Sequence, residues 1–175
     1  MKTLAIVALL TLGCFLLGCG TTTTATTAAG GNWAVTFAPG DPPAYVTLFN
    51  FETTFSVSGS GALSVTFVNF LTSSPNSCFS ATGEGDTVGG SFDVTSLPSD
   101  PTATANVTFT VQGGGNSLAL TGQAVGVTNT VAQTTTWNAV TGTWTLSGTS
   151  ACTLGVTTPK GTFTMCPNST TCSTT

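Results

Sequence analysis

From Gly31 onward, apolar and polar residues alternate in short segments, and glycine-rich turns separate these segments. A period of two places successive side chains on opposite faces and is typical of β-strands with one buried face. The clearest segment covers residues 106–112, where Val107, Phe109 and Val111 alternate with polar neighbours. The pattern predicts roughly nine strands, including a short one over residues 78–83, and no helix in this region.

Turns as short as Gly59-Ser60-Gly61 connect antiparallel neighbours, so we expect a single all-β antiparallel meander. The apolar faces of the strands must meet, and closure into a barrel of about 8–10 strands removes exposed edges. A two-sheet β-sandwich is the alternative. We expect side chains to fill the interior, namely those that the alternation places inward: Trp33, Val35, Phe37, Phe51, Phe55, Val57, Leu63, Val65, Phe67, Phe92, Val107, Phe109, Val111, Leu118, Leu120, Trp144, Leu146 and Phe163.

The N-terminus has a different pattern, in which Lys2 precedes an apolar run over residues 4–17. A membrane-spanning helix needs about 20 residues, so this shorter run is typical of a secretory signal peptide. The run ends in Leu16-Leu17-Gly18-Cys19, which resembles the lipobox of bacterial lipoproteins. The resemblance implies cleavage after residue 18 and an acyl anchor, palmitate included, on Cys19. Later cleavage near residue 28 and processing at Cys14 are the alternatives.

The same resemblance implies a location in the cell envelope, with the membrane as a partner through the N-terminal lipid. Gly20, in place of Asp, follows the cysteine, which by the sorting rule of lipoproteins implies the outer membrane. We expect residues 1–18 to be the signal peptide, 19–30 a Thr-rich tether, 31–166 the β-domain and 167–175 a C-terminal tail.

The start of the β-domain carries a second resemblance. Gly31-Asn32-Trp33 is similar to the Gly-x-Trp signature of lipocalins, and the mature sequence resembles Thr/Gly-rich β lipoproteins that begin their domain with Gly-Asn-Trp. The chain has no arginine that could stack on Trp33, so the ligand binding of lipocalins is not carried over.

Charge is scarce, because 5% of the residues are charged where roughly 25% is usual. After removal of the signal peptide, Lys160 is the one basic side chain, so the clustered positive charge that nucleic-acid binding needs is missing. Histidine is absent, which removes the imidazole base of the usual Ser-His and Cys-His nucleophiles. We therefore expect no enzyme activity, no cofactor and no nucleic-acid partner.

Four cysteines remain after processing besides the acylated Cys19, and in an oxidising compartment an even number predicts disulfides. We expect Cys78 to pair with Cys152 and Cys166 with Cys172, although the sequence allows two other pairings. A zinc site is the alternative, but the ligand spacing does not fit and no histidine is available.

Two further features are candidates for a site. Glu84 and Asp86 are a close pair of carboxylates, and we interpret Gly83-Glu84-Gly85-Asp86 as a solvated turn rather than a calcium or catalytic site. Trp137 lies seven positions from Trp144, so on a continuous strand the two rings face opposite sides. We expect Trp137 to be exposed, where it would stack on a sugar or contact a protein, unless a loop or the tether covers it.

The sequence thus predicts a membrane-anchored envelope lipoprotein that acts as a non-catalytic structural or interaction module, with an envelope protein or glycan as its partner. The alternative is a lipocalin-like carrier of a small ligand or glycan. The bulky inward side chains favour the first hypothesis, because a carrier needs a cavity.

Overall fold

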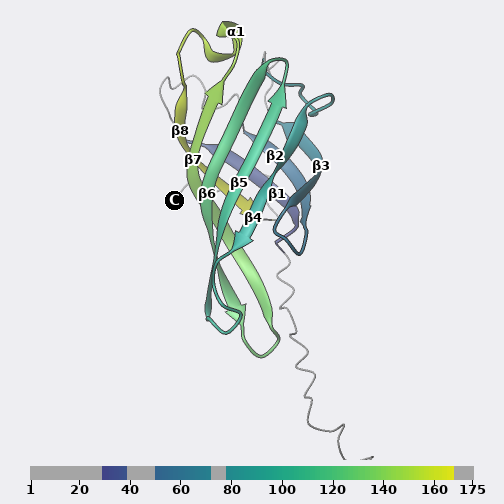
Figure 1. Ribbon diagram of the computed structural model, residues 1–175, viewed down its shortest axis with the longest axis vertical. Helices are drawn as coiled ribbons and strands as arrows, with labels where there is room; N and C mark the ends of the chain where they lie inside the picture. The colour runs from purple at the N-terminus through teal and green to yellow at the C-terminus, as the bar shows by residue number, and fades with distance from the viewer. Residues whose placement is uncertain (1–28, 39–49, 72–77, 168–175) are drawn as a thin grey trace, which may run out of the picture.

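The computed structural model describes residues 29–38, 50–71 and 78–167. These residues form eight strands and one short helix (Figure 1): β1 (Gly31–Phe37), β2 (Phe51–Val57), β3 (Leu63–Phe70), β4 (Thr87–Val94), β5 (Thr102–Gly113), β6 (Asn116–Asn129), β7 (Thr134–Ser147), α1 (Ser150–Thr153) and β8 (Lys160–Pro167). Strand β8 runs one residue past the predicted end of the domain at 166.

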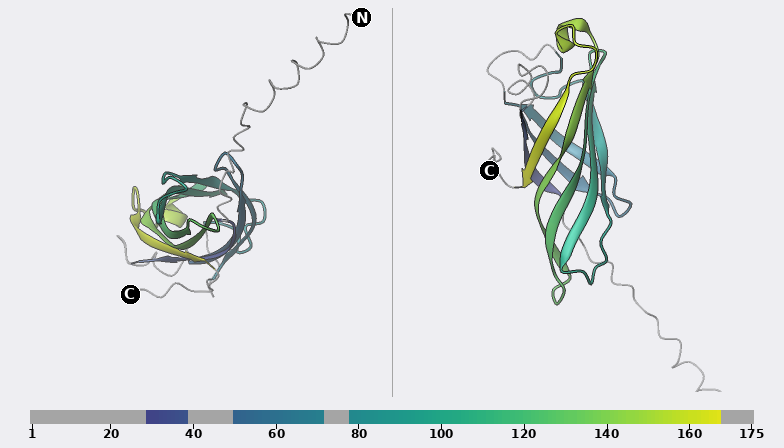
Figure 2. Two further views of the ribbon diagram at one scale, coloured as in Figure 1. Left: turned by 90° about the horizontal axis from the view of Figure 1, so that it is seen from below. Right: turned by 90° about the vertical axis from the view of Figure 1, so that its left-hand side faces the viewer.

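The strands form one antiparallel sheet in the order β3-β2-β1-β8-β7-β6-β5-β4. Except for β3 and β4, which form the two edges, strands that follow one another in the sequence are neighbours in the sheet, and β1 pairs with β8. The sheet curls into a nearly closed barrel (Figure 2, left), whose seam lies between β3 and β4 and is bridged by the pair Ala62 and Ser91. The predicted all-β meander barrel is confirmed, and the sandwich alternative is not observed.

Aromatic side chains meet across the inside of the barrel. The Phe51 ring lies 5.6 Å from that of Phe109 and 5.4 Å from that of Phe70, and Phe37 meets Trp144 edge-on at 5.8 Å. These five side chains are at most 4% exposed. Most of the predicted inward residues are buried in the same cluster, and Val57, Leu63 and Val65 are partly buried against it.

The prediction that Phe67 faces the interior is wrong, because its side chain is 45% exposed. The pairing of β2 with β3 shifts here: Thr54 pairs with Phe67, but Phe55 pairs with Val65, which leaves Thr66 as an extra residue. Such a β-bulge reverses which side of the strand faces inward. Val68 takes the inward place, and it is 3% exposed.

The strand predicted over residues 78–83 is absent, and this segment is a loop whose Ala81 carbonyl accepts a 2.8 Å hydrogen bond from the Phe70 amide at the end of β3. Phe79 is nevertheless buried, because its ring stacks on Phe70 at a centroid distance of 5.6 Å. One turn of helix, α1, was also not predicted. Thr149 caps it by accepting a hydrogen bond from the Cys152 amide, and four residues are too few to show a helical period.

Candidate functional site

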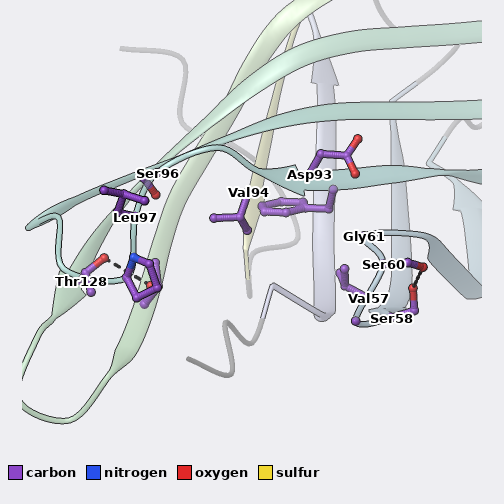
Figure 3. A pocket seen from close by; sticks show the side chains of 13 residues that line it. Val57, Ser58, Ser60, Gly61, Asp93, Val94, Ser96, Leu97 and Thr128 are labelled. Carbon is purple, nitrogen blue, oxygen red and sulfur yellow. Dashed lines mark hydrogen bonds between the residues drawn. The ribbon is translucent and has the colours of Figure 1, made fainter. Parts of the chain in front are cut away.

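A cleft of about 700 Å³ lies at the end of the barrel that carries the β2–β3 and β6–β7 turns. Its walls come from the β2–β3 hairpin, the end of β4 with the loop that follows it, and the ends of β6 and β7 (Figure 3). The volume lies within the range of roughly 300–1,000 Å³ that is usual for small-ligand sites. The apolar side chains among its lining residues are Val57, Phe92, Val94, Leu97 and Pro98.

The β2–β3 hairpin forms one wall and is tied to β4 across the seam. Gly61 has φ +84, a left-handed conformation that glycine adopts without strain, and its carbonyl accepts a 2.7 Å hydrogen bond from the Phe92 amide. A Cβ at Gly61 would meet the carboxylate of Asp93, so this side chain lies against the turn. The Ser58 and Ser60 hydroxyls are hydrogen-bonded to each other at 2.9 Å and place polar groups at the rim (Figure 3).

The loop between β4 and β5 forms the opposite wall. The Asp100 carboxylate accepts a 2.9 Å hydrogen bond from the Leu97 amide, which closes the loop on itself. The apolar side chains stay outside this turn, so that Leu97 is 65% and Val94 41% exposed. Thr128 from β6 and Thr135 from β7 are hydrogen-bonded to each other through their hydroxyls at 3.3 Å beside this loop.

Beneath the cleft, Phe92 packs edge-on against Trp137, with ring centroids 4.9 Å apart. The two side chains are 1% and 4% exposed. Within the described residues, the Trp137 indole N–H is buried without a hydrogen-bond partner. A buried donor without a partner costs about 1–3 kcal/mol, and the packing of the Trp137 ring must offset this cost.

The burial of Trp137 contradicts the prediction of an exposed contact residue. Gly126 pairs with Trp137 while Val125 pairs with Ala139, so Asn138 is an extra residue in β7. This second bulge turns Trp137 to the same side as Trp144. Gly126 makes room for the ring, since a Cβ there would lie 3.0 Å from the Trp137 Cε3 atom.

The cleft offers little acid–base chemistry. Asp93 is the one titratable side chain among its described lining residues, and it is exposed. In the part of the chain that the structure describes, no three His, Cys, Asp or Glu residues lie close enough to hold a metal ion. Glu84 is exposed and Asp86 accepts a 3.0 Å hydrogen bond from the Ser80 amide, which makes this pair part of a turn.

The disulfide between Cys78 and Cys152 is present, as predicted, with Cα atoms 4.8 Å apart. It lies at the end of the barrel opposite the cleft, where the buried Asn116 donates to the Cys78 carbonyl at 2.8 Å and accepts from the Thr149 amide at 2.9 Å. The disulfide therefore fixes α1 and the loop before β4 rather than the cleft.

The other predicted cysteines are described only in part. Cys166 takes part in a disulfide. Cys172 and the lipidation residue Cys19 lie outside the described residues. The pairing of Cys166 with Cys172 and the acylation of Cys19 therefore stay predictions.

The two turns that line the cleft could be predicted from the sequence, but their proximity in the fold could not. Gly59-Ser60-Gly61 and the Pro98–Pro101 loop are evident as turns, yet about forty residues separate them. They share one end of the barrel because β2 and β4 run toward the same end, with β3 returning between them. The partners of β3 and β4 across the seam could not be read from periodicity.

Comparisons with protein-family models, with curated proteins and with solved structures gave no match for this chain. Within residues 29–38, 50–71 and 78–167, no helix has the length and hydropathy to cross a bilayer.

Proposed function

We propose that this protein is a lipid-anchored module of the cell envelope. It is anchored through Cys19, and its partners bind the outer surface of the barrel. The observation that carries the proposal is the packed interior, where the buried rings of Phe51 and Phe109 meet across the barrel 5.6 Å apart and Trp144 is fully buried. What such a barrel offers to an envelope protein or a glycan is its Thr-rich outer face.

The anchor rests on Leu16-Leu17-Gly18-Cys19 and on the tether that follows. One acyl chain binds a membrane marginally, whereas two or three hold it stably. Replacement of Cys19 by Ser should move the protein from the outer-membrane fraction to the soluble fraction. The N-terminal peptide of the wild-type protein should carry an acylated Cys19 in mass spectrometry. A soluble wild-type protein whose N-terminus lies beyond Cys19 would contradict the anchor.

The cleft supports a second candidate function, the carriage of a small ligand with one apolar and one polar side. Its volume of about 700 Å³ and its lining of apolar side chains beside the Ser58 and Ser60 hydroxyls favour this candidate. A ligand that binds the folded state raises the melting temperature by mass action. The C19S protein should be screened with medium-chain fatty acids and monosaccharides.

The first function predicts no shift of the melting temperature in this screen. A shift at low micromolar ligand that Val94→Trp abolishes, while the matched exposed-site variant Leu154→Trp keeps it, would establish the carrier. Val94 lines the cleft, whereas Leu154 is 57% exposed after α1 at the far end, so the pair separates filling of the cleft from a general effect of an added ring.

A further inference from the structure

The end of the barrel that carries the cleft is also the end at which the chain enters the fold. The Trp33 indole N–H donates to the Ala29 carbonyl at 3.1 Å, and Gly31 pairs with Phe55. A Cβ at Gly30 would lie 3.2 Å from the Ser56 Cα atom. The chain therefore joins the barrel beside the end of β2, immediately before the cleft residue Val57.

Strands β5, β6 and β7 extend farthest at this end (Figures 1 and 2). The pairing of β7 with β8 begins at Val140, so the part of β7 from Thr134 to Ala139 is paired with β6 alone. The β6–β7 hairpin therefore projects as a tongue beyond the body of the barrel.

Exposed apolar side chains are concentrated on this projecting end. Val131, at the tip of the tongue, is 95% exposed, and Val127 on β6 is 60% exposed. Leu97 and Val94 belong to the neighbouring loop and strand end, and Val125 lies farther up β6. We call Val94, Leu97, Val127 and Val131 the tip residues.

Several backbone amides at the tip donate hydrogen bonds to side chains of the same loops. The Asn129 side chain accepts hydrogen bonds from the Val131 and Ala132 amides at 3.1 and 3.0 Å. Asp100 does the same for the Leu97 amide. A loop whose donors are already paired can leave water at a smaller cost than one whose donors are not.

Charge at this end points to a neutral surface as the partner. The single basic side chain of the described residues, Lys160, pairs with Thr145 toward the far end of the barrel. Asp93 adjoins Val94 in the sequence, Asp100 accepts the hydrogen bond of the Leu97 amide, and residues 130–133 carry no charge. Electrostatic attraction to anionic lipid is therefore excluded as the driving force, and burial of apolar side chains remains.

We infer that the tip residues rest in the interfacial layer of a lipid bilayer, with the cleft facing the membrane; this inference rests on the proposed anchor at Cys19. Ala29 is ten positions after Cys19. Ten residues of chain reach at most about 35 Å when fully extended, which bounds the distance from the anchor to Ala29. The tether thus holds the tip within reach of the lipid, so that contacts too weak to bind a free protein are populated.

The experiment places a bimane label at Val131→Cys in the full acylated protein, with Leu154→Cys as the matched control. Leu154 is also exposed and apolar but lies beyond α1 at the far end. The proteins are reconstituted into phosphatidylcholine vesicles that contain doxyl-labelled lipid as quencher. We expect quenching of the Val131 label to be severalfold stronger than that of the Leu154 label and to be unchanged by salt between about 0.05 and 0.5 M.

The double substitution Leu97→Ser and Val127→Ser should reduce the Val131 quenching to the level of the control. Equal quenching of the two labels would overturn the inference. A dimer that buries the Val131 label would also overturn it, and sedimentation of the same sample detects such a dimer. Mass spectrometry of the N-terminal peptide tests the anchor separately. An acylated Cys19 with an unquenched tip rejects the orientation alone, and an unmodified Cys19 rejects the anchor.

Discussion

Single substitutions of Trp137 and Phe67 by alanine test the two bulges against the simple alternation of the strands. Alternation places Phe67 inside and Trp137 outside, and the structure places them the other way round, at 45% and 4% exposure. The two variants therefore have opposite expected rankings. Unfolding free energies distinguish the two arrangements without any further structure determination.

The expected loss for Trp137→Ala follows from its burial. An aromatic side chain buries roughly 150–250 Å², which at about 25 cal/mol per Å² amounts to about 4–6 kcal/mol. Substitutions of this kind in packed cores cost about 3–5 kcal/mol. The unpartnered indole N–H is removed at the same time, which returns about 1–3 kcal/mol. With the middle of each range, the net loss is about 2–3 kcal/mol, against less than about 1 kcal/mol for Phe67→Ala.

Urea unfolding of the unreduced C19S protein, followed by circular dichroism, measures both values. In a domain of this size each kcal/mol corresponds to roughly 2–4 °C in melting temperature, which gives a second readout. Trp137→Phe is the control, and it should lose less than Trp137→Ala because a ring remains against Phe92 while the unpartnered donor is gone. A larger loss for Phe67→Ala than for Trp137→Ala would refute the bulge at Asn138.

Three further predictions concern the same unfolding assay. Phe109→Ala should cost about 3–5 kcal/mol, because its ring is 1% exposed at the centre of the barrel, and a nearly neutral result would mean that the interior is loosely packed. Removal of the disulfide by Cys78→Ala with Cys152→Ala should cost about 4 kcal/mol, because the closed loop spans 74 residues; a loss below about 1 kcal/mol would argue against this account. Gly142→Ala should cost about 1–3 kcal/mol, because its Cβ would collide with the β6 backbone, whereas an unchanged midpoint would show that the two strands can separate.

The strands and the barrel could be predicted from the sequence because the signal for them is local. In β5, Val107, Phe109 and Val111 are buried, whereas their polar neighbours are exposed or, in the case of Thr110, half-buried, as the alternation requires. Three-residue turns such as Gly59-Ser60-Gly61 leave antiparallel pairing as the only arrangement. The pairing of Cys78 with Cys152 was also within reach, since few partners were available.

The two bulges could not be predicted from the sequence, because the position of a bulge depends on the pairing with the partner strand. Thr66 and Asn138 are ordinary strand residues, and nothing in their own chemistry marks them as extra. Gly126 is the one local clue, since a glycine inside a strand often indicates a bulge or a close contact. Each bulge places one aromatic side chain on the opposite face from the one that alternation predicts. Because the bulge at Asn138 was not predicted, the buried Trp137 was expected at the surface.

The cleft depends on tertiary structure in the same way. Its walls belong to turns that carry clear local signals, but their meeting depends on the seam between β3 and β4, which a single bridge at Ala62 and Ser91 closes. Exposure of Leu97 and Val131 likewise follows from how far β6 and β7 extend past β8, a length that no motif encodes.

The pairing of β1 with β8 also determines when the barrel can close. Proteins are made from the N-terminus, so β1 is complete long before β8 exists. Until β8 exists, β1 pairs with β2 alone and its other edge has no partner strand. The slowest contact to form is therefore the one between the first and last strands, because it closes the longest loop of the chain. A nascent chain that stops before Lys160 lacks the partner of both β1 and β7, so the final strand decides whether the earlier seven become a barrel or remain an open, aggregation-prone sheet.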